Sequence, residues 1–309
     1  MEILLQQIIN GLVLGSIYAL IALGYTMVYG IIQLINFAHG EVLMVGALTA
    51  WSIIGLMQSS MPGTPGWIIL IIAMLIACVV AATLNFVIEK VAYKPLRNSP
   101  RLAPLITAIG MSILLQTLAM IIWKPNYKPF PTLLPSQPFN VGGAFITPTQ
   151  IMILSVTAVS LAVLMWLVNH TKIGRAMRAT AENPRVAGLM GVKPDMVISA
   201  TFIIGAILAA IAGVMYASNY GTAQHTMGFL PGLKAFTAAV FGGIGNLGGA
   251  VLGGLLLGLI EAIGSGYIGT LTGGLLGSHY TDIFAFIVLI IILTLRPSGL
   301  LGERVADRA

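Results

Sequence analysis

Few residues of this sequence stand in arrangements that support enzymatic chemistry. No Gly-Lys dipeptide occurs in its 309 residues, so the phosphate-binding loop of P-loop ATPases is missing. Segment 243–248 (Gly-Ile-Gly-Asn-Leu-Gly) matches the dinucleotide-binding fingerprint, but no strand is expected before it and it lies in an apolar, Gly-rich stretch. Neither a Gly-x-Ser-x-Gly elbow nor a His-Glu-x-x-His motif is present. We therefore predict no catalytic residues, no metal site and no cofactor.

His39 and Glu41 are two ionisable residues near the start of an apolar run, 38–57. Asn36 precedes them and is a good helix cap, and the positive end of a helix favours an acidic residue in the first turn. A metal site needs further ligands nearby, and the sequence offers none. We predict a structural role for both residues at the start of a helix.

Lys234 and Glu261 fall inside two consecutive apolar runs, 230–244 and 247–263. Charged side chains at such positions are costly and usually face a partner or water. Lys234 lies near the start of its run and Glu261 near the end of the next. Antiparallel packing of the two runs therefore places both residues near the outer side, at a similar depth. We predict an ion pair or a shared polar network, with two separate snorkelling side chains as the alternative.

Glycines recur at spacings that suit close packing of helices. Gly245, Gly249 and Gly253 follow one another every fourth residue, as do Gly254 and Gly258. Small residues at this spacing let two helix backbones approach closely. We predict a helix-packing face here, and Gly-rich broken helices that line a transport path are the alternative.

The elements that position these residues follow from composition. Hydrophobic residues make up 58% of the chain and charged residues only 8%, against about 45–50% and about 25% in soluble domains. Nine acidic and fifteen basic residues cannot cover a water-facing globule of this size. The single cysteine, Cys78, excludes an internal disulfide. The composition predicts an all-α, polytopic transmembrane helix bundle.

Nine apolar runs are candidates for crossing the membrane. Five are long enough without question, and four are less certain because they are short or carry charges. Fifteen helical residues span only about 22 Å, less than a hydrocarbon core of about 30 Å, so one or two runs are expected to be re-entrant or broken. We predict eight or nine crossings, from the clear runs 8–32, 67–88, 102–123, 149–168 and 196–217 and the less certain runs 38–57, 230–244, 247–263 and 280–295.

Basic residues set the orientation, because Lys and Arg collect in cytoplasmic loops. Twelve of the fifteen lie after the runs that end at 88, 168 and 295, and these segments are expected inside. Loops 58–66, 124–148 and 218–229 are expected outside. If all nine runs cross, the amino terminus lies outside and the carboxyl terminus inside. The positive net charge is therefore a topology signal, and we expect no nucleic acid partner.

The inner loop 170–195 is too long for a simple helical hairpin. Asn183 is a good N-cap, Pro184 suits the first helical position, and Gly191 followed by Pro194 is a stop, which predicts a helix of about two turns. Val186, Leu189 and Met190 form one apolar stripe on it. Such a stripe fits a groove on a partner protein, although packing on the membrane surface or on the chain's own inner face is an equal alternative.

The outer loop 124–148 is rich in proline and carries interleaved aromatic side chains. Proline makes the loop stiff and hard to fold into regular elements. It suits either contact with a periplasmic binding protein or a lid over the bundle.

Four segments together resemble the LivH-type permease subunits of high-affinity branched-chain amino acid ABC importers. They are 24–30 (Gly-Tyr-Thr-Met-Val-Tyr-Gly), 35–41 (Ile-Asn-Phe-Ala-His-Gly-Glu), 181–184 (Ala-Glu-Asn-Pro) and 232–245 (Gly-Leu-Lys-Ala-Phe-Thr-Ala-Ala-Val-Phe-Gly-Gly-Ile-Gly). The resemblance covers nearly the whole chain and implies a single ABC-transporter permease domain, 1–309. It also implies that 180–191 is the ATPase-contacting segment, although Ala181-Glu182 replaces the Glu-Ala-Ala pattern of other ABC permeases. The implied coupling residues are Ala181, Glu182, Asn183, Pro184, Arg185, Val186, Leu189 and Met190.

The resemblance further implies the setting in which the chain works. We expect a bacterial inner (plasma) membrane and four kinds of partner: a second paralogous permease subunit, two cytoplasmic ATP-binding subunits, a periplasmic amino-acid-binding protein and membrane lipid. ATP hydrolysis is expected on the separate subunits. The same family carries short amides or urea, which is one alternative. An ion-driven secondary transporter and a polytopic enzyme are the others, and the sequence leaves the substrate-binding residues unknown.

Overall fold

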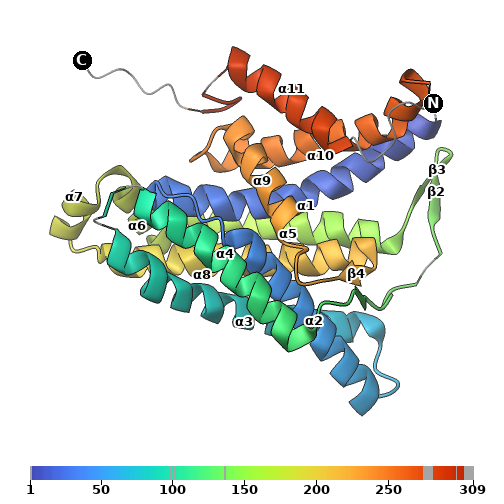
Figure 1. Ribbon diagram of the computed structural model, residues 1–309, viewed down its shortest axis with the longest axis horizontal. Coiled ribbons are helices and arrows are strands. Elements are labelled where there is room, and N and C mark those ends of the chain that lie inside the picture. The colour runs from blue at the N-terminus through green and yellow to red at the C-terminus, as the bar shows by residue number, and fades with distance from the viewer. Residues whose placement is uncertain are drawn as a thin grey trace.

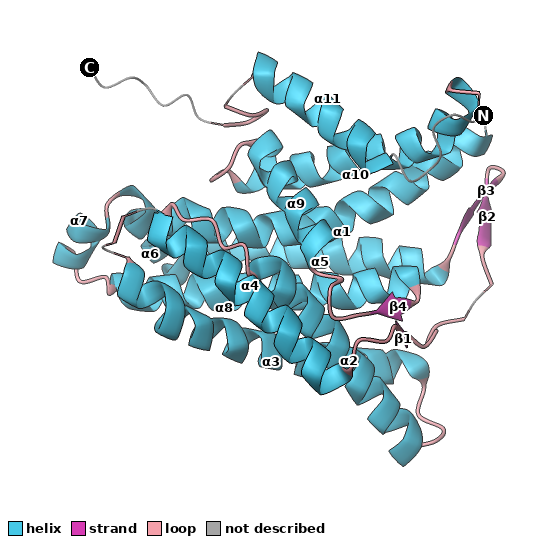
Figure 2. Ribbon diagram, in the orientation of Figure 1, coloured by secondary structure: helices cyan, strands magenta, loops and turns pink. Residues whose placement is uncertain are grey.

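The computed structural model describes residues 2–97, 99–100, 102–135, 137–273, 281–296 and 298–302 (Figure 1). These residues form a helical bundle, with short strands gathered toward one end (Figure 2). In chain order the elements are α1 (Glu2–Ile32), α2 (His39–Ser60), α3 (Gly66–Ile88), the π-helix η1 (Glu89–Tyr93), the 3-10 helix η2 (Lys94–Leu96), α4 (Leu102–Trp123), β1 (Lys128–Pro129), β2 (Phe139–Val141), β3 (Ala144–Ile146), α5 (Pro148–His170), α6 (Lys172–Glu182), α7 (Pro184–Leu189), α8 (Pro194–Tyr220), β4 (Thr222–Ala223), α9 (Phe229–Gly242), α10 (Leu247–Leu271) and α11 (Thr281–Leu295).

Each of the nine apolar runs corresponds to a helix, but not all of these helices have the length of a membrane span. Seven helices in the described ranges are long and apolar enough to cross: α1, α2, α3, α4, α5, α8 and α10. α9 has 14 residues and α11 has 15, which correspond to about 21–22 Å. The expected count of eight or nine crossings is therefore not confirmed by helix length. Tyr280, where the last run was expected to begin, lies outside the described residues.

α2 and α9 both begin inside the bundle. A Cβ atom added to Gly24 of α1 would overlap the imidazole of His39, the first residue of α2. Gly24 is eight residues before the end of α1, so α2 begins about 12 Å back along the axis of α1 from that end. Gly228, just before α9, meets Gly40 in the first turn of α2 so closely that a side chain on either would strike the other's backbone. α9 is short because it starts at this depth, and it then runs obliquely across the bundle (Figure 1).

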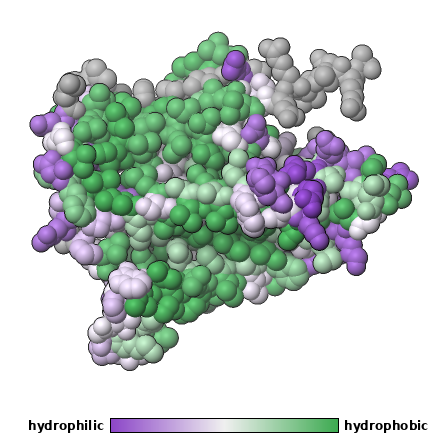
Figure 3. All heavy atoms as spheres, turned by 180° about the vertical axis from the view of Figure 1, so that it is seen from behind, coloured by the Kyte–Doolittle hydropathy of each residue, from purple (hydrophilic) through white to green (hydrophobic). Residues whose placement is uncertain are grey.

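The core of the bundle is formed by α1, α2 and α8. Between two thirds and three quarters of the residues in their most apolar windows are buried, against 22% for α4 and α5. These outer helices instead expose large apolar side chains such as Ile106, Ile121, Val159 and Trp166. Figure 3, which shows the molecule from behind, shows a broad apolar band with hydrophilic residues gathered toward its two ends. Such a surface suits contact with lipid or with another membrane subunit.

The glycines of α10 pack against two different helices. Gly254 and Gly258 contact the backbone of α1 at Ala19 and Gly15, while Gly249 and Gly253 contact α9 at Gly242 and Ala238. Gly245 does not share this face, contrary to the prediction. It lies in the turn before α10 with a φ of +97° and with open space around its Cβ position. Asn246 caps α10 by accepting a hydrogen bond from the backbone N–H of Gly249, which is why the helix begins after Gly245.

Replacement of Gly258 by alanine tests the contact between α1 and α10. The added methyl group would collide with the backbone of Gly15, and overpacking of this kind costs about 1–3 kcal/mol. We expect Gly258→Ala to lower the thermal unfolding midpoint in detergent. Gly110→Ala in α4 is the matched control because its Cβ position is open, and it should leave the midpoint unchanged or raise it. Equal midpoints for the two variants would contradict this contact.

Candidate functional site

Loop 170–195, which was expected on the inner side, folds into two helices, α6 and α7, that join α5 to α8. Asn183 caps α7, because its Oδ1 atom accepts hydrogen bonds from the backbone N–H groups of Arg185 and Val186, each at 3.1 Å. Pro184 occupies the first helical position, and Gly191 follows the helix with a φ of +85°. The expected start and stop signals thus delimit this helix.

The apolar side chains of this loop face away from the rest of the chain. Val186, Leu189 and Met190 are 51%, 83% and 80% exposed, whereas Ala187, beside them on the helix, is buried. The neighbouring segment from Glu182 to Arg185 is also exposed, and Ala181 is half-buried. Within the part of the chain that the structure describes, the stripe therefore does not pack on the chain's own inner face, which was one of the two alternatives. Exposed apolar side chains at the tip of a rigid helix are typical of a contact surface.

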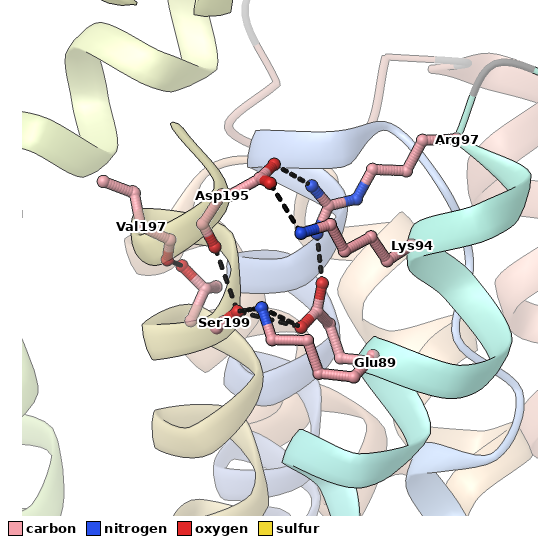
Figure 4. A network of polar contacts seen from close by, with 8 residues as sticks. Glu89, Lys94, Arg97, Asp195, Val197 and Ser199 are labelled. Carbon is pink, nitrogen blue, oxygen red and sulfur yellow. Dashed lines mark hydrogen bonds and ion pairs between the residues drawn. The ribbon is translucent and has the colours of Figure 1, made fainter. Parts of the chain in front are cut away.

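A network of charged groups lies where this loop enters α8 (Figure 4). Asp195, in the first turn of α8, forms ion pairs with Arg97 at 2.6 Å and Lys94 at 2.8 Å. Arg97 also pairs with Glu89, whose side chain is completely buried and accepts a hydrogen bond from Ser199 at 2.8 Å. The network joins η1 and η2, which follow α3, to the start of α8.

This network was not predicted from the sequence. Glu89 and Asp195 stand among basic residues of two loops that are 106 residues apart, so each looked like part of a solvated cytoplasmic segment. Only the packing of α3 against α8 brings them together. Breaking a buried charge pair is strongly destabilising, because it leaves the other charge without a partner. The buried Arg97–Glu89 pair lies within the segment after α3, and the start of α8 joins it through the hydrogen bond from Ser199 to Glu89 and through the exposed Asp195.

Lys234 of α9 and Glu261 of α10 are in contact, with 2.7 Å between Lys234 Nζ and Glu261 Oε1. The structure adds a third charge that the sequence did not suggest, because Asp282 of α11 also lies 2.7 Å from Lys234 Nζ. Tyr18 of α1 donates a hydrogen bond to Glu261 at 2.9 Å. Four helices thus meet at one lysine, which is shared by two carboxylates.

His39 and Glu41 lie in the first turn of α2, as expected, but Asn36 is not its N-cap. The N-cap is Ala38, and Asn36 Oδ1 instead accepts from the backbone N–H of Ala38 at 3.1 Å and from the Tyr93 hydroxyl at 2.7 Å. His39 packs edge-on against Tyr25, with 4.7 Å between ring centres. No cluster of three His, Cys, Asp or Glu side chains suited to a metal ion occurs within the described ranges.

The proline-rich outer loop forms regular elements after all, contrary to expectation. β2 and β3 pair as a hairpin, and β1 pairs with β4, which follows α8. Gln6 of α1 exchanges two hydrogen bonds with the backbone of Phe145, and Trp51 of α2 donates to the carbonyl of Pro129 at 2.9 Å. The loop is therefore fixed to the start of α1 and to the second half of α2.

The described residues form a multi-pass helical bundle with an exposed helical loop at one end, and this arrangement defines a polytopic membrane protein. Comparison with known proteins identifies its family. A family profile described as the branched-chain amino acid transport system permease component matches residues 7–293. The chain belongs to this family of permease components.

Relatives in this family match over nearly the whole chain. BraD of Pseudomonas aeruginosa and LivH of Escherichia coli K12, both named high-affinity branched-chain amino acid transport system permease proteins, are each 45% identical over 97% of this chain and 96% of their own. A probable branched-chain amino acid permease of Methanocaldococcus jannaschii is 26% identical over 96% of this chain and 92% of its own. No solved structure matches this chain.

Substitutions at Lys234 and Glu261 test the shared network. Lys234→Met leaves two carboxylates close together without a cation, so we expect a loss of about 3–5 kcal/mol. Glu261→Gln leaves Lys234 paired with Asp282 and should cost less, about 1–3 kcal/mol. The double variant should be more stable than Lys234→Met alone, because it removes one of the two orphaned carboxylates. Additive losses in detergent unfolding would show that the residues act independently.

Proposed function

We propose that this chain is one permease subunit of an ATP-driven importer of branched-chain amino acids in a bacterial inner membrane. The observation that carries the proposal is the exposed apolar stripe of α7, at the tip of a basic loop, in a member of a permease family. The 45% identical relatives are named for branched-chain amino acid transport, which favours this substrate class over short amides or urea.

In this proposal α7 is the coupling helix. It has exposed apolar side chains for a groove on a cytoplasmic ATP-binding subunit, and it is anchored through α8 to the Glu89 network. Closure of two such subunits around ATP would move α7 as a rigid body and tilt α8, producing alternating access. ATP hydrolysis would take place on those subunits, because this chain has no phosphate-binding loop.

Two further partners complete the proposed assembly. The exposed apolar faces of α3, α4 and α5 offer surface for a second, paralogous permease subunit and for lipid. At the opposite end, Phe139, Val141 and Phe145 are exposed on the β2–β3 hairpin, and they suit a periplasmic amino-acid-binding protein.

The proposed topology has the amino terminus outside and nine crossings. α9 supplies one of them together with segment 221–228, which leads from the outer end of α8 into the bundle. The basic residues of η1, η2 and α6 then lie inside, in agreement with the distribution of Lys and Arg. Of the tail, Arg296 is described, whereas Arg304 and Arg308 lie outside the described residues.

An ion-driven secondary transporter is the second candidate, and the Lys234 network is the feature that favours it. The two candidates differ in what drives uptake. Proteoliposomes of this chain alone that accumulate leucine under an ion gradient, without nucleotide, would support the secondary transporter and contradict an ATP-driven subunit.

Introduction of a negative charge on α7 tests the coupling proposal. We expect Leu189→Asp or Val186→Asp to reduce ATP-dependent leucine uptake by at least about tenfold, because a carboxylate cannot be buried in an apolar groove without a partner. Uptake is measured in proteoliposomes that contain the complete transporter. Met61→Asp, at a similarly exposed apolar residue in the loop between α2 and α3, is the matched control and should leave leucine uptake unchanged. Full uptake by Leu189→Asp would refute coupling through α7.

Labelling with a membrane-impermeant thiol reagent tests the topology. Cys78 is the only cysteine, so Cys78→Ser gives a background for single-cysteine variants. Val141→Cys should react in intact spheroplasts, and Met190→Cys should react only after the membrane is opened. Both positions are exposed. The reverse pattern would overturn the proposed orientation.

A further inference from the structure

A cavity of about 780 Å³ lies where α2 and α9 begin. Its volume falls within the range of about 300–1,000 Å³ that is usual for small-molecule sites. The wall comes from the start of α2, the middle of α4, the end of α8, segment 222–228 and the start of α9. Ser112 and Gln116 alternate with Ile109 and Ile113 along one face of α4 in this lining, and Leu230 of α9 adds a further apolar side chain.

Glu41 lies directly behind this wall and is only 1% exposed. Its Oε1 atom accepts hydrogen bonds from Gln116 at 2.8 Å and Ser112 at 3.1 Å, and both donors line the cavity. Its Oε2 atom has no hydrogen-bond partner among the described residues. That oxygen lies 3.1 Å from the Cβ position of Gly228, which is another lining residue.

Burial of a carboxylate that has one oxygen without a hydrogen bond and no cationic partner is unfavourable in free energy. Other carboxylates inside the bundle have a cationic partner that offsets the loss of hydration: Glu261 pairs with Lys234, and Glu89 pairs with Arg97. None of the ion pairs among the described residues includes Glu41. Glu41 therefore has no cationic partner among the described residues, and it is connected to the cavity through its hydrogen bonds with the lining residues Ser112 and Gln116.

The same cavity receives the amino-terminal ends of two helices. Gly40 in the first turn of α2, and Phe229 and Leu230 in the first turn of α9, line its wall. The positive end of a helix dipole attracts an anionic group, and helices that begin at membrane depth are used in this way in transport sites. Gly228 and Gly40 lie so close that only glycine fits there, so backbone rather than side chains forms this part of the wall.

An amino acid zwitterion has the three features that this wall complements. Its ammonium group matches Glu41, its carboxylate matches the two helix ends, and an aliphatic side chain matches Ile109, Ile113 and Leu230. We infer that the cavity is a transient binding station for the amino acid during passage, with Glu41 as the residue that receives the ammonium group. The Gln116 amide and the Ser112 hydroxyl donate to that carboxylate in the unloaded site. This inference rests on the proposed function.

The first experiment compares Glu41→Gln with wild type in proteoliposomes that contain the complete transporter. The substitution keeps the shape of the side chain but removes its charge. We expect leucine uptake to fall at least about tenfold, as for the loss of a hydrogen bond to a charged group, while ATP hydrolysis stimulated by the binding protein stays within about twofold. Glu2→Gln, at the exposed outer start of α1, is the matched control and should transport normally.

The second experiment measures the charge in the cavity without using transport. Ile113→Cys in a Cys78→Ser background places a thiol on the cavity wall. Cationic and anionic methanethiosulfonate reagents of similar size should react with it at rates whose ratio favours the cation. We expect Glu41→Gln to lower this ratio at least about threefold, because the local potential becomes less negative.

The outcomes separate this inference from the function on which it rests. Leucine uptake by Glu41→Gln at the wild-type rate, or an unchanged reagent ratio, would overturn the binding station while leaving the importer intact. Loss of the second permease subunit on purification of Glu41→Gln would also overturn it, since the carboxylate would then pair with that subunit. If the wild-type complex imports no branched-chain amino acid with ATP, the proposed function itself fails, whatever the reagent ratio.

Discussion

In a hydrocarbon environment every backbone N–H and C=O group needs a partner within the protein, and this constraint decides where the chain can leave helical geometry. Segments 33–38 and 221–228 interrupt the helices of the bundle, and both are held by contacts with other elements although Gln33, Thr222 and Thr226 are exposed. Asn36 bonds the backbone N–H of Ala38, and it is itself held by the Tyr93 hydroxyl. β4 pairs with β1, and the carbonyl of Gly221 accepts from the backbone N–H of Phe130. The bundle therefore surrounds two breaks with partners, and the helices that follow them begin beside one shared cavity.

The same constraint applies to charge, and it divides the buried ionisable residues into two groups. Glu89 is satisfied by Arg97 and Ser199, and Glu261 by Lys234 and Tyr18, so these carboxylates hold helices together. Glu41 is held by neutral donors on only one of its oxygens. A structural carboxylate at that position would be expected to have a cationic partner, as the others do. Glu41, unlike the paired carboxylates, has no cationic partner among the described residues. We therefore infer that a mobile cationic group binds in the cavity beside it.

The helices were predictable from the sequence because apolar runs report membrane burial directly, and Asn183, Pro184 and Gly191 are local signals for the ends of α7. Contacts between distant segments were not predictable. Asp282 joins Lys234 across 48 residues, and β1 pairs with a strand 94 residues away. Gly245 was misplaced because a four-residue glycine spacing does not reveal where a helix begins, whereas the Asn246 cap does. The strands of loop 124–148 were not predicted because its many prolines argued against regular structure. Proline is nevertheless tolerated at the edge of a short strand, and β1 itself ends at Pro129.

α8 connects the two ends of the proposed mechanism. Its first residues follow α7 and include Asp195, and near its other end Tyr216 and Tyr220 line the cavity. Most of the helix between them is buried against α1, α2 and α3, so it is held as one stiff element. Gly46 meets Ala210 and Gly213 meets Leu43 at distances that leave no room for a side chain, so α2 follows closely when α8 tilts. Glu41 and Gly40 stand at the start of α2, so in the proposed mechanism a displacement of α7 would be passed to the cavity through two packed helices. α8 and its glycine contacts with α2 are the physical connection between the proposed coupling surface and the cavity.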